Sequence, residues 1–141
     1  MLRHNTMFNM SLPSIKVSRI IQAAPEKVWD MLTDTECWTK WGPTVRAVQS
    51  ETQYIEAGST GYVKTVFGFW APFAITEWMH QQYWSWRVFN IRATGHRIEI
   101  INADCCRLIF EVPLWAAPYA IICQMAARRI ARILEAGDSP G

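Results

Sequence analysis

The hydropathy period of this sequence changes twice, and these changes limit the folds that the chain can adopt. Between residues 44 and 112, six runs alternate with a period of two and are separated by short breaks rich in Gly, Pro, Asn or Asp. The runs are VRAVQSETQYI, GYVKTVFGFW, FAITEWMH, WSWRVFNI, HRIEII and CRLIFEV. An earlier β-branched run, SIKVSRIIQA, precedes Pro25 and predicts one more strand. Because such connections favour a meander, the sequence predicts one antiparallel sheet of seven strands.

Helical spacing appears between the first and second predicted strands, in APEKVWDMLTDTECWTKWGP, residues 24–43. Pro25 suits the first position of a helix, because proline lacks the N–H that the first turn leaves unpaired. Val28, Trp29 and Leu32 then share one side of this helix. We therefore expect a short helix with Trp29 in the core.

A second short helix is predicted directly after the first. Thr33 and Glu36 have the spacing of a capping box, and Trp38 and Trp41 lie three residues apart on one face. Gly42 and the following proline end the pattern. We expect these two helices to form a V, with Trp38 and Trp41 near the mouth of any pocket.

The end of the chain, LWAAPYAIICQMAARRIARILEA at residues 114–136, predicts one long helix. A helix of about 20 residues is long enough to cross a domain of this size. A curved sheet cannot fill its own concave face, so we expect the helix to lie across it and the two short helices to close one end. The predicted fold class is α+β. The predicted apolar stripe is Tyr119, Ile122, Ala126, Ile130 and Ile133, opposite Arg128, Arg132 and Glu135.

The length of 141 residues predicts a single domain, which we assign to residues 14–136. Residues 1–13 and 137–141 are expected to be flexible tails. No run approaches the about 18 uninterrupted apolar residues of a membrane span, and the first residues lack the apolar region of a secretion signal. The four cysteines form no CxxC pair, which favours free thiols in a reducing compartment. The predicted location is the cytoplasm.

Several classes of function are excluded by the charge and the motifs. A net charge of +2 is too small for a nucleic-acid-binding protein. His4, His80 and His96 do not have metal-ligand spacing with acids or thiols. The sequence contains no GxSxG, P-loop or GxGxxG motif, so we predict neither a metal nor a cofactor.

The order of the motifs resembles that of a known family. AAPEKVWDMLTD, WTKWGP, GSTGYVKT, PFAITEW, WSWRV, ATGHRIEI and RLIFEVP follow one another as in the SRPBCC superfamily, whose START-related members have the helix-grip fold. The resemblance covers roughly residues 14–135 and is greatest to the polyketide cyclase/dehydratase-like branch. It implies an apolar cavity between the sheet and the C-terminal helix for a lipid, a polyketide or an aromatic compound. Binding of such a hydrophobic small molecule is the leading interpretation.

Two alternative functions are compatible with the same resemblance. The first is a polyketide cyclase or dehydratase-like enzyme, which would work by positioning its substrate. The second is a protein-interaction module resembling the Hsp90-activator relatives of this fold, which would present an exposed apolar patch. The sequence identifies no catalytic residue for the enzyme.

The walls of the implied cavity require large apolar side chains. The candidates are Trp29, Trp70, Trp78, Trp84, Trp86 and Trp115. The same indoles could instead fill the interior and leave little space.

His96 is the ionisable residue most expected to face the cavity. Strand alternation places His96, Ile98 and Ile100 on one face and Arg97 on the other. A histidine there could hold a ligand carbonyl, or it could be a core histidine bonded to a neighbour. The predicted ligand-binding residues are His96, Trp84, Trp86, Trp78, Tyr119 and Ile122.

The alternation in FAITEWMH leaves its orientation open. Either Phe73, Ile75, Glu77 and Met79 face inward, or Thr76, Trp78 and His80 do. An inward Glu77 would need a partner such as Arg87, whereas an outward pair of the two residues costs less.

Overall fold

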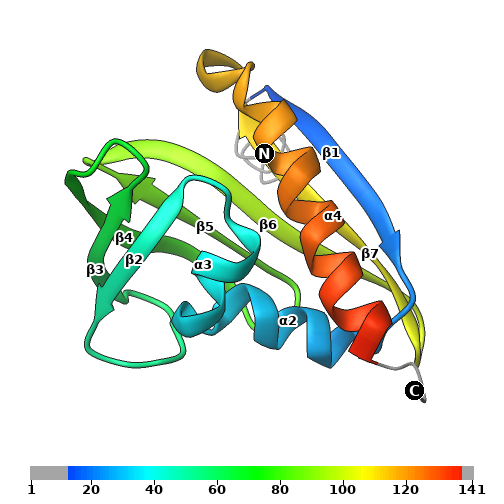
Figure 1. The fold of residues 1–141 in the computed structure, drawn as a ribbon. Helices are drawn as coiled ribbons and strands as arrows, with labels where there is room; N and C mark the ends of the chain where they lie inside the picture. Colours follow the sequence, from blue (N-terminus) through cyan, green and yellow to red (C-terminus); the bar gives the residue numbers. More distant parts are fainter. Residues whose placement is uncertain (1–12, 138–141) are drawn as a thin grey trace, which may run out of the picture.

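The computed structural model describes residues 13–137, so the predicted tails lie almost wholly outside the described residues. Seven strands form one antiparallel sheet in the order β1-β7-β6-β5-β4-β3-β2, which confirms the predicted meander (Figure 1). The strands are β1 (Ser14–Ile21), β2 (Val45–Ser50), β3 (Thr60–Thr65), β4 (Trp70–Met79), β5 (Tyr83–Val88), β6 (Ile91–Asn102) and β7 (Cys105–Pro113). In this part of the chain, no helix is long and apolar enough to cross a membrane.

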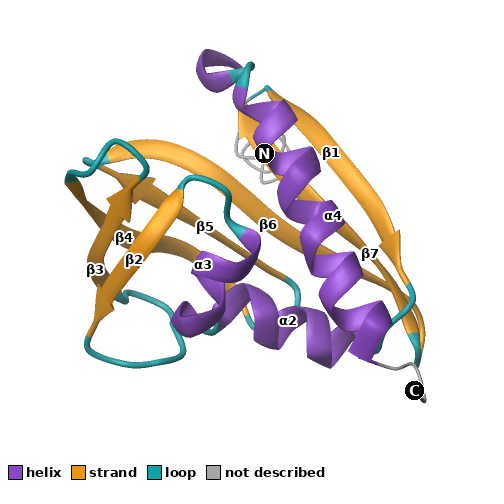
Figure 2. Cartoon of the chain, viewed as in Figure 1, coloured by secondary structure: helices purple, strands orange, loops and turns teal. Residues whose placement is uncertain are grey.

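The helices lie on the concave side of the curved sheet (Figure 2). They are α2 (Pro25–Thr33), the 3-10 turn η1 (Thr35–Cys37), α3 (Trp38–Trp41), the 3-10 turn η2 (Leu114–Ala116) and α4 (Tyr119–Gly137). Figure 1 shows α4 beside β1 and β7, with α2 and α3 across the remaining opening. This is the predicted α+β helix-grip arrangement.

The terminal helix begins later than the sequence predicts, at Tyr119 instead of residue 114. Pro118 has no N–H to donate to the carbonyl of Leu114, so a continuous helix cannot pass through it. The buried stripe also differs, because Ile133 is 38% exposed. The residues of α4 that enter the core are Cys123, Ala126, Ala127, Ile130 and Ala131.

The turn between the two short helices is capped one residue later than predicted. The side chain of Asp34, and not that of Thr33, accepts a hydrogen bond from the backbone N–H of Glu36 at 2.9 Å. The Thr33 hydroxyl instead donates to the Trp29 carbonyl at 2.9 Å. Thr33 is still inside α2, so its backbone is helical, whereas Asp34 has the extended backbone that a capping residue needs.

Trp38 and Trp41 are core residues, and both also line the cavity described below. Trp38 Nε1 donates to the carbonyl of Leu32 at 2.9 Å, and Trp41 Nε1 donates to that of Met31 at 2.7 Å. Both carbonyls belong to the last turn of α2, where a helix leaves its acceptors unpaired. The two indoles therefore terminate α2 and fix the angle between α2 and α3. Trp29 is buried, as predicted.

The two possible orientations of the fourth strand both occur, one in each half of β4. Phe73 and Ile75 point into the core, but the register with β5 shifts between Ile75 and Glu77. Beyond this bulge Trp78 points inward, with its ring centroid 5.4 Å from that of Trp29. Glu77 is exposed and accepts a hydrogen bond from Ser85.

The predicted pairing of Glu77 with Arg87 is wrong. The register places Glu77 opposite Ser85 and Arg87 opposite Ala74. Arg87 instead donates to the carbonyl of Asn90 at 2.9 Å, within the β5–β6 turn.

Candidate functional site

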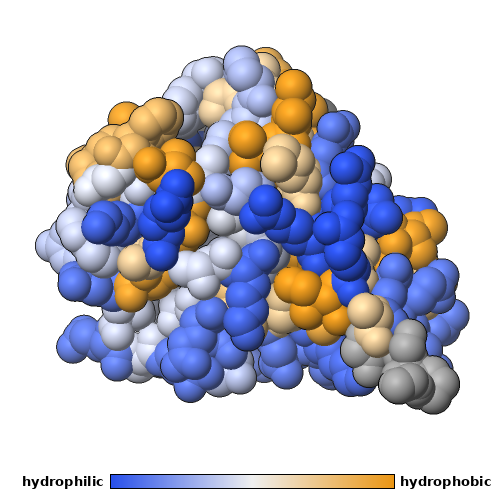
Figure 3. Space-filling model, in the orientation of Figure 1, coloured by the Kyte–Doolittle hydropathy of each residue, from blue (hydrophilic) through white to orange (hydrophobic). Residues whose placement is uncertain are grey.

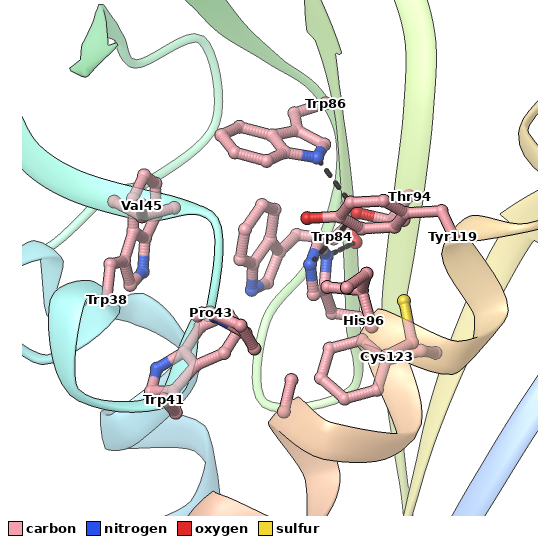
Figure 4. Close-up of a pocket in the computed structure, with 14 residues that line it drawn as sticks. Trp38, Trp41, Pro43, Val45, Trp84, Trp86, Thr94, His96, Tyr119 and Cys123 are labelled. Carbon is pink, nitrogen blue, oxygen red and sulfur yellow. Dashed lines mark hydrogen bonds between the residues drawn. The ribbon is translucent and has the colours of Figure 1, made fainter. Parts of the chain in front are cut away.

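A small cavity lies between the sheet, α3 and α4, at the position that the resemblance implies (Figure 4). Its volume is about 40 Å³. Strands β5 and β6 contribute Trp84, Trp86, Thr94 and His96 to its wall. We call this space the inner cavity; it holds about one water-sized group.

Packed indoles explain why the inner cavity is small, in line with the alternative that the indoles fill most of the interior. Trp84 stacks on Trp38, with ring centroids 5.7 Å apart and planes 14° apart. Trp86 meets the edge of both rings, at 5.8 Å from Trp84 and 5.4 Å from Trp38. Because the short helix α3 inserts Trp38 between the strands and α2, the space is filled.

His96 is buried in this cluster and its two nitrogens have protein partners. Nδ1 lies 3.2 Å from the carbonyl oxygen of Trp84, and Nε2 lies 3.4 Å from Oγ1 of Thr94. The carbonyl can only accept, so Nδ1 carries the proton and Nε2 is the acceptor. Trp86 Nε1 donates to the Thr94 hydroxyl at 3.0 Å, and this hydroxyl can donate onward to Nε2.

Burial lowers the pKa of His96 from its usual 6.5 to about 3, although the bond to the Trp84 carbonyl opposes this shift. The imidazole is therefore neutral at physiological pH. Burial also raises the pKa of the Cys123 thiol in the same wall to about 12, so this group stays protonated. The inner cavity thus carries no charge from either side chain.

Trp84 has a buried polar atom without a partner. Its indole Nε1 makes no hydrogen bond to any residue within 13–137. The ring itself is fully buried and lines the inner cavity. Figure 4 shows this nitrogen at the end of the ring that faces Pro43 and Trp41. An unpaired buried N–H costs free energy, and an acceptor brought within hydrogen-bond distance would recover it.

A second space, open to solvent, continues from the inner cavity toward the start of α4. Its volume is about 260 Å³, and its wall is mainly apolar, with Val63 of β3, Val88 of β5 and Trp115 of η2. We call this space the outer groove. Val45, Trp86, Thr94 and Tyr119 line both spaces and therefore form the partition between them.

The partition is held by a hydrogen bond between two distant parts of the chain. The Tyr119 hydroxyl, at the first residue of α4, lies 2.7 Å from the Thr44 hydroxyl, just before β2. Burial raises the pKa of Tyr119. The phenol remains protonated and can donate to Thr44 or accept from it.

Five of the six predicted ligand-binding residues line the inner cavity. They are His96, Trp84, Trp86, Tyr119 and Ile122. Trp78 is not among the lining residues and packs against Trp29 and His80 instead. Ile100, predicted to share the face of His96, lies beside a register shift in β6 and is 69% exposed.

The predicted ligand-binding set leaves out several residues of the inner-cavity wall, among them Thr94, Trp38 and Trp41. Thr94 has the same strand parity as His96, so alternation alone could have identified it. Trp38 and Trp41 enter the wall because α3 folds under α2, and the sequence does not give that crossing. Among the described residues, no group of His, Cys, Asp or Glu is arranged to hold a metal ion.

Solved structures show the same fold at low sequence identity. The protein XoxI from Bacillus cereus superposes with a TM-score of 0.70 at 9% identity, over 91% of this chain and 99% of that chain. The Aha1 dimer from Colwellia psychrerythraea gives 0.67 at 16% identity, over 91% and 100%. A hypothetical protein from Helicobacter pylori gives 0.68 at 14% identity, over 89% and 90%. These likenesses support the fold alone.

Sequence comparison gives the family directly. None of the curated proteins has a significantly similar sequence. Residues 13–136, however, match the family described as "Polyketide cyclase / dehydrase and lipid transport". This match spans every strand and all but the last residue of α4. The chain therefore belongs to the polyketide cyclase/dehydrase and lipid transport family of the SRPBCC superfamily.

Proposed function

We propose that this protein binds a neutral, hydrophobic small molecule in the outer groove and the inner cavity. In this proposal the apolar body of the ligand lies in the groove, and a hydrogen-bond acceptor at its end reaches Trp84 Nε1. The observation that carries the proposal is this buried N–H, which has no partner within the described residues although the histidine beside it is fully bonded.

The walls favour an uncharged ligand with a carbonyl or similar acceptor. Among residues 13–137, no Asp, Glu, Lys or Arg lines either space. A charged group placed there would lose its hydration without gaining a partner. Lipids, polyketides and aromatic compounds that carry a ketone, ester or quinone oxygen meet both requirements.

The space available sets how such a ligand would fit. The inner cavity has room for a single carbonyl group, whereas the outer groove approaches the lower end of the size range of small-molecule pockets. The partition at Trp86 and Tyr119 would have to move for a larger group to enter. We therefore assign only the acceptor group to the inner cavity.

A cyclase or dehydratase-like enzyme is the second candidate, but the ionisable groups favour binding over turnover. General acid–base catalysis is most efficient when the pKa of the catalytic group is near the operating pH. The pKa of His96 is about 3 and that of Cys123 about 12. Neither residue would therefore be an efficient general acid or general base at neutral pH.

Native mass spectrometry of protein purified from its own host tests the proposal. We expect a retained neutral small molecule, and direct binding of the fluorescent ketone 6-propionyl-2-dimethylaminonaphthalene in titrations. Trp84→Phe should weaken ketone binding about threefold to tenfold, the worth of one net hydrogen bond. The matched control is 2-dimethylaminonaphthalene, which lacks the carbonyl and should bind both proteins equally.

Other results would contradict the proposal. An equal loss of affinity for the ketone and for 2-dimethylaminonaphthalene in Trp84→Phe would mean that the N–H is not the anchor. An adduct-free protein that does not bind the ketone would remove the ligand-binding role. Chemical conversion of a bound carbonyl compound would favour the enzyme.

A further inference from the structure

Large apolar side chains are exposed together at one end of the sheet. In an antiparallel meander the β3–β4 turn, the β5–β6 turn and the end of β7 lie at the same end, and η2 follows β7 there. Phe67 is 83% exposed and Trp115 65%. Figure 3 shows apolar side chains at the upper left, above the strand ends, and again at the top near the start of α4. We call the following six residues the aromatic rim: Phe67, Phe69, Phe89, Ile91, Leu114 and Trp115.

The members of the rim form connected contacts across separate turns. The ring centroids of Phe67 and Phe69 are 6.4 Å apart, and those of Phe69 and Phe89 are 6.1 Å apart. Trp115 Nε1 donates to the carbonyl of Arg92 at 3.1 Å, which ties η2 to the start of β6. The rim is therefore a joint surface of three chain segments.

Phe89 occupies a backbone conformation that disfavours it. Its φ is 53° and that of Asn90 is 60°, so the two residues form a hairpin turn with left-handed backbone. Asn, Asp and Gly suit such positions, whereas a bulky residue is strained there. The side chain is nevertheless half exposed and gains little burial in return. Its placement at this turn is thus better explained by a contact outside the chain than by stability.

The charges at the same end are of one sign. Among the described residues, the segments that reach this end are 13–16, 43–47, 62–72, 86–94 and 112–121, and they contain no Asp or Glu. They carry Lys16, Arg46, Lys64, Arg87 and Arg92. At the opposite end, the connections after β1, β2 and β6 carry several carboxylates, which include Glu26, Glu51, Glu56 and Asp104. The net charge of +2 therefore conceals a basic rim end that complements an anionic surface.

The rim borders the mouth of the outer groove. Trp115 belongs to both, and Val88, which lines the groove, directly precedes Phe89. A surface seated on the rim would therefore cover the groove opening. Aromatic side chains with basic neighbours suit the interface of an anionic bilayer, where rings partition among the headgroups and cations meet phosphates.

We propose that the aromatic rim docks this protein onto an anionic phospholipid surface. Phe67, Phe89 and Trp115 enter the headgroup layer, and the basic side chains contact the phosphates. The docking stands on the rim alone. Its consequence, that the ligand passes between bilayer and groove without crossing water, rests on the proposed function.

Vesicle co-sedimentation of the full chain tests the docking. One set of vesicles consists of phosphatidylcholine and the other of equal parts of phosphatidylcholine and phosphatidylglycerol. We expect binding to the anionic vesicles that weakens with salt, and little binding to the neutral ones. In the double variant Phe67→Ser/Phe89→Asn, the affinity for the anionic vesicles should fall by a factor of roughly ten or more.

Two features of this test distinguish a loss of docking from misfolding of the double variant. Phe89→Asn relieves the strained turn, so the double variant should melt no lower than the unmodified protein. The matched control is Ile100→Ser, since Ile100 is 69% exposed at the opposite end of the sheet and should not affect vesicle binding. Neither Phe67 nor Phe89 lines the groove, so ketone binding in solution should be unchanged in the double variant.

Several outcomes would overturn the docking. One is equal vesicle binding by the double variant and the unmodified protein, which would reduce the effect to charge alone. Another is the absence of vesicle binding combined with a dimer in sedimentation that the double variant abolishes, because a second copy would then cover the rim. Vesicle binding by a protein that carries no adduct and does not bind the ketone would instead leave the docking intact and remove the proposed ligand function.

Discussion

The imidazole of His96 stacks on the indole of Trp84 with ring centroids 3.8 Å apart and planes 18° apart, while its Nδ1 lies 3.2 Å from the Trp84 carbonyl oxygen. His96 thus contacts both the ring and the backbone carbonyl of Trp84. The arrangement fixes the tautomer of His96 and orients the indole N–H of Trp84 that lacks a partner within residues 13–137.

Acid should destabilise the protein through His96. Its pKa is about 3 in the fold against 6.5 in the unfolded chain, so below pH 6.5 the unfolded chain binds a proton that the folded chain does not. The free energy of unfolding should therefore fall, by up to several kcal/mol, as the pH decreases from about 6.5 toward 3. Urea unfolding at a series of pH values measures this slope.

The control for this titration is His96→Gln, which cannot titrate. All carboxylates remain in the variant, so only the contribution of His96 disappears from the slope. Equal slopes in the two proteins would mean that His96 is not kept neutral by burial.

Replacing His96 with phenylalanine should lower stability more than ligand affinity. The phenyl ring preserves the stack but leaves the Trp84 carbonyl without its donor and Thr94 without its acceptor, at a cost of about 1–3 kcal/mol. Ketone affinity should change less than in Trp84→Phe. Paired melting and titration curves measure both effects, and a larger affinity loss than in Trp84→Phe would make His96 the anchor instead.

Two Trp→Phe substitutions should differ in stability because one N–H is bonded and the other is not. Trp38→Phe removes the donor to the Leu32 carbonyl and should cost about 1–3 kcal/mol beyond the loss of ring volume. Trp84→Phe removes an N–H with no partner in the described chain, so it should cost clearly less. Both residues are buried, and chemical denaturation compares them directly. An equal cost would indicate that Trp84 Nε1 is satisfied in solution.

The order and type of the elements could be predicted because the hydropathy period changes from two to 3.6 at their boundaries. The bulge in β4 could not, since it places Phe73 and Trp78 on the same face although their sequence separation is odd. Strict alternation therefore could not decide which side chains of that strand face inward.

The site was predictable only where strand parity decides it. Parity placed Trp84, Trp86 and His96 together, and all three line the inner cavity. The roles of Trp38 and Trp41 depend on hydrogen bonds to carbonyls of α2, which follow from the crossing of two helices and leave no mark in the sequence pattern. The unpaired N–H of Trp84 likewise leaves no mark in the pattern, because it depends on the lack of an acceptor atom beside it among residues 13–137.

Trp29→Ala should be among the most destabilising single substitutions. The indole is buried and packs edge-on against Trp78, so its removal leaves a large cavity and should cost about 3–5 kcal/mol. Trp115→Ala provides the comparison, because that indole is mostly exposed and should cost far less. Thermal melting checks the difference. Similar melting temperatures for both variants would mean that α2 does not pack against β4 as described.

Opening the partition should speed ligand entry. Tyr119→Phe and Thr44→Val each remove the 2.7 Å hydrogen bond that joins the start of α4 to the segment before β2. If this bond must break before the acceptor of a ligand reaches Trp84, its loss lowers the barrier by about 0.5–1.5 kcal/mol, which corresponds to roughly threefold to tenfold faster association. Stopped-flow mixing with the fluorescent ketone measures the rate. The double variant should associate no faster than either single variant, because the same bond is lost in all three. Additive acceleration, or unchanged rates in both single variants, would show that ligands reach the inner cavity by another route.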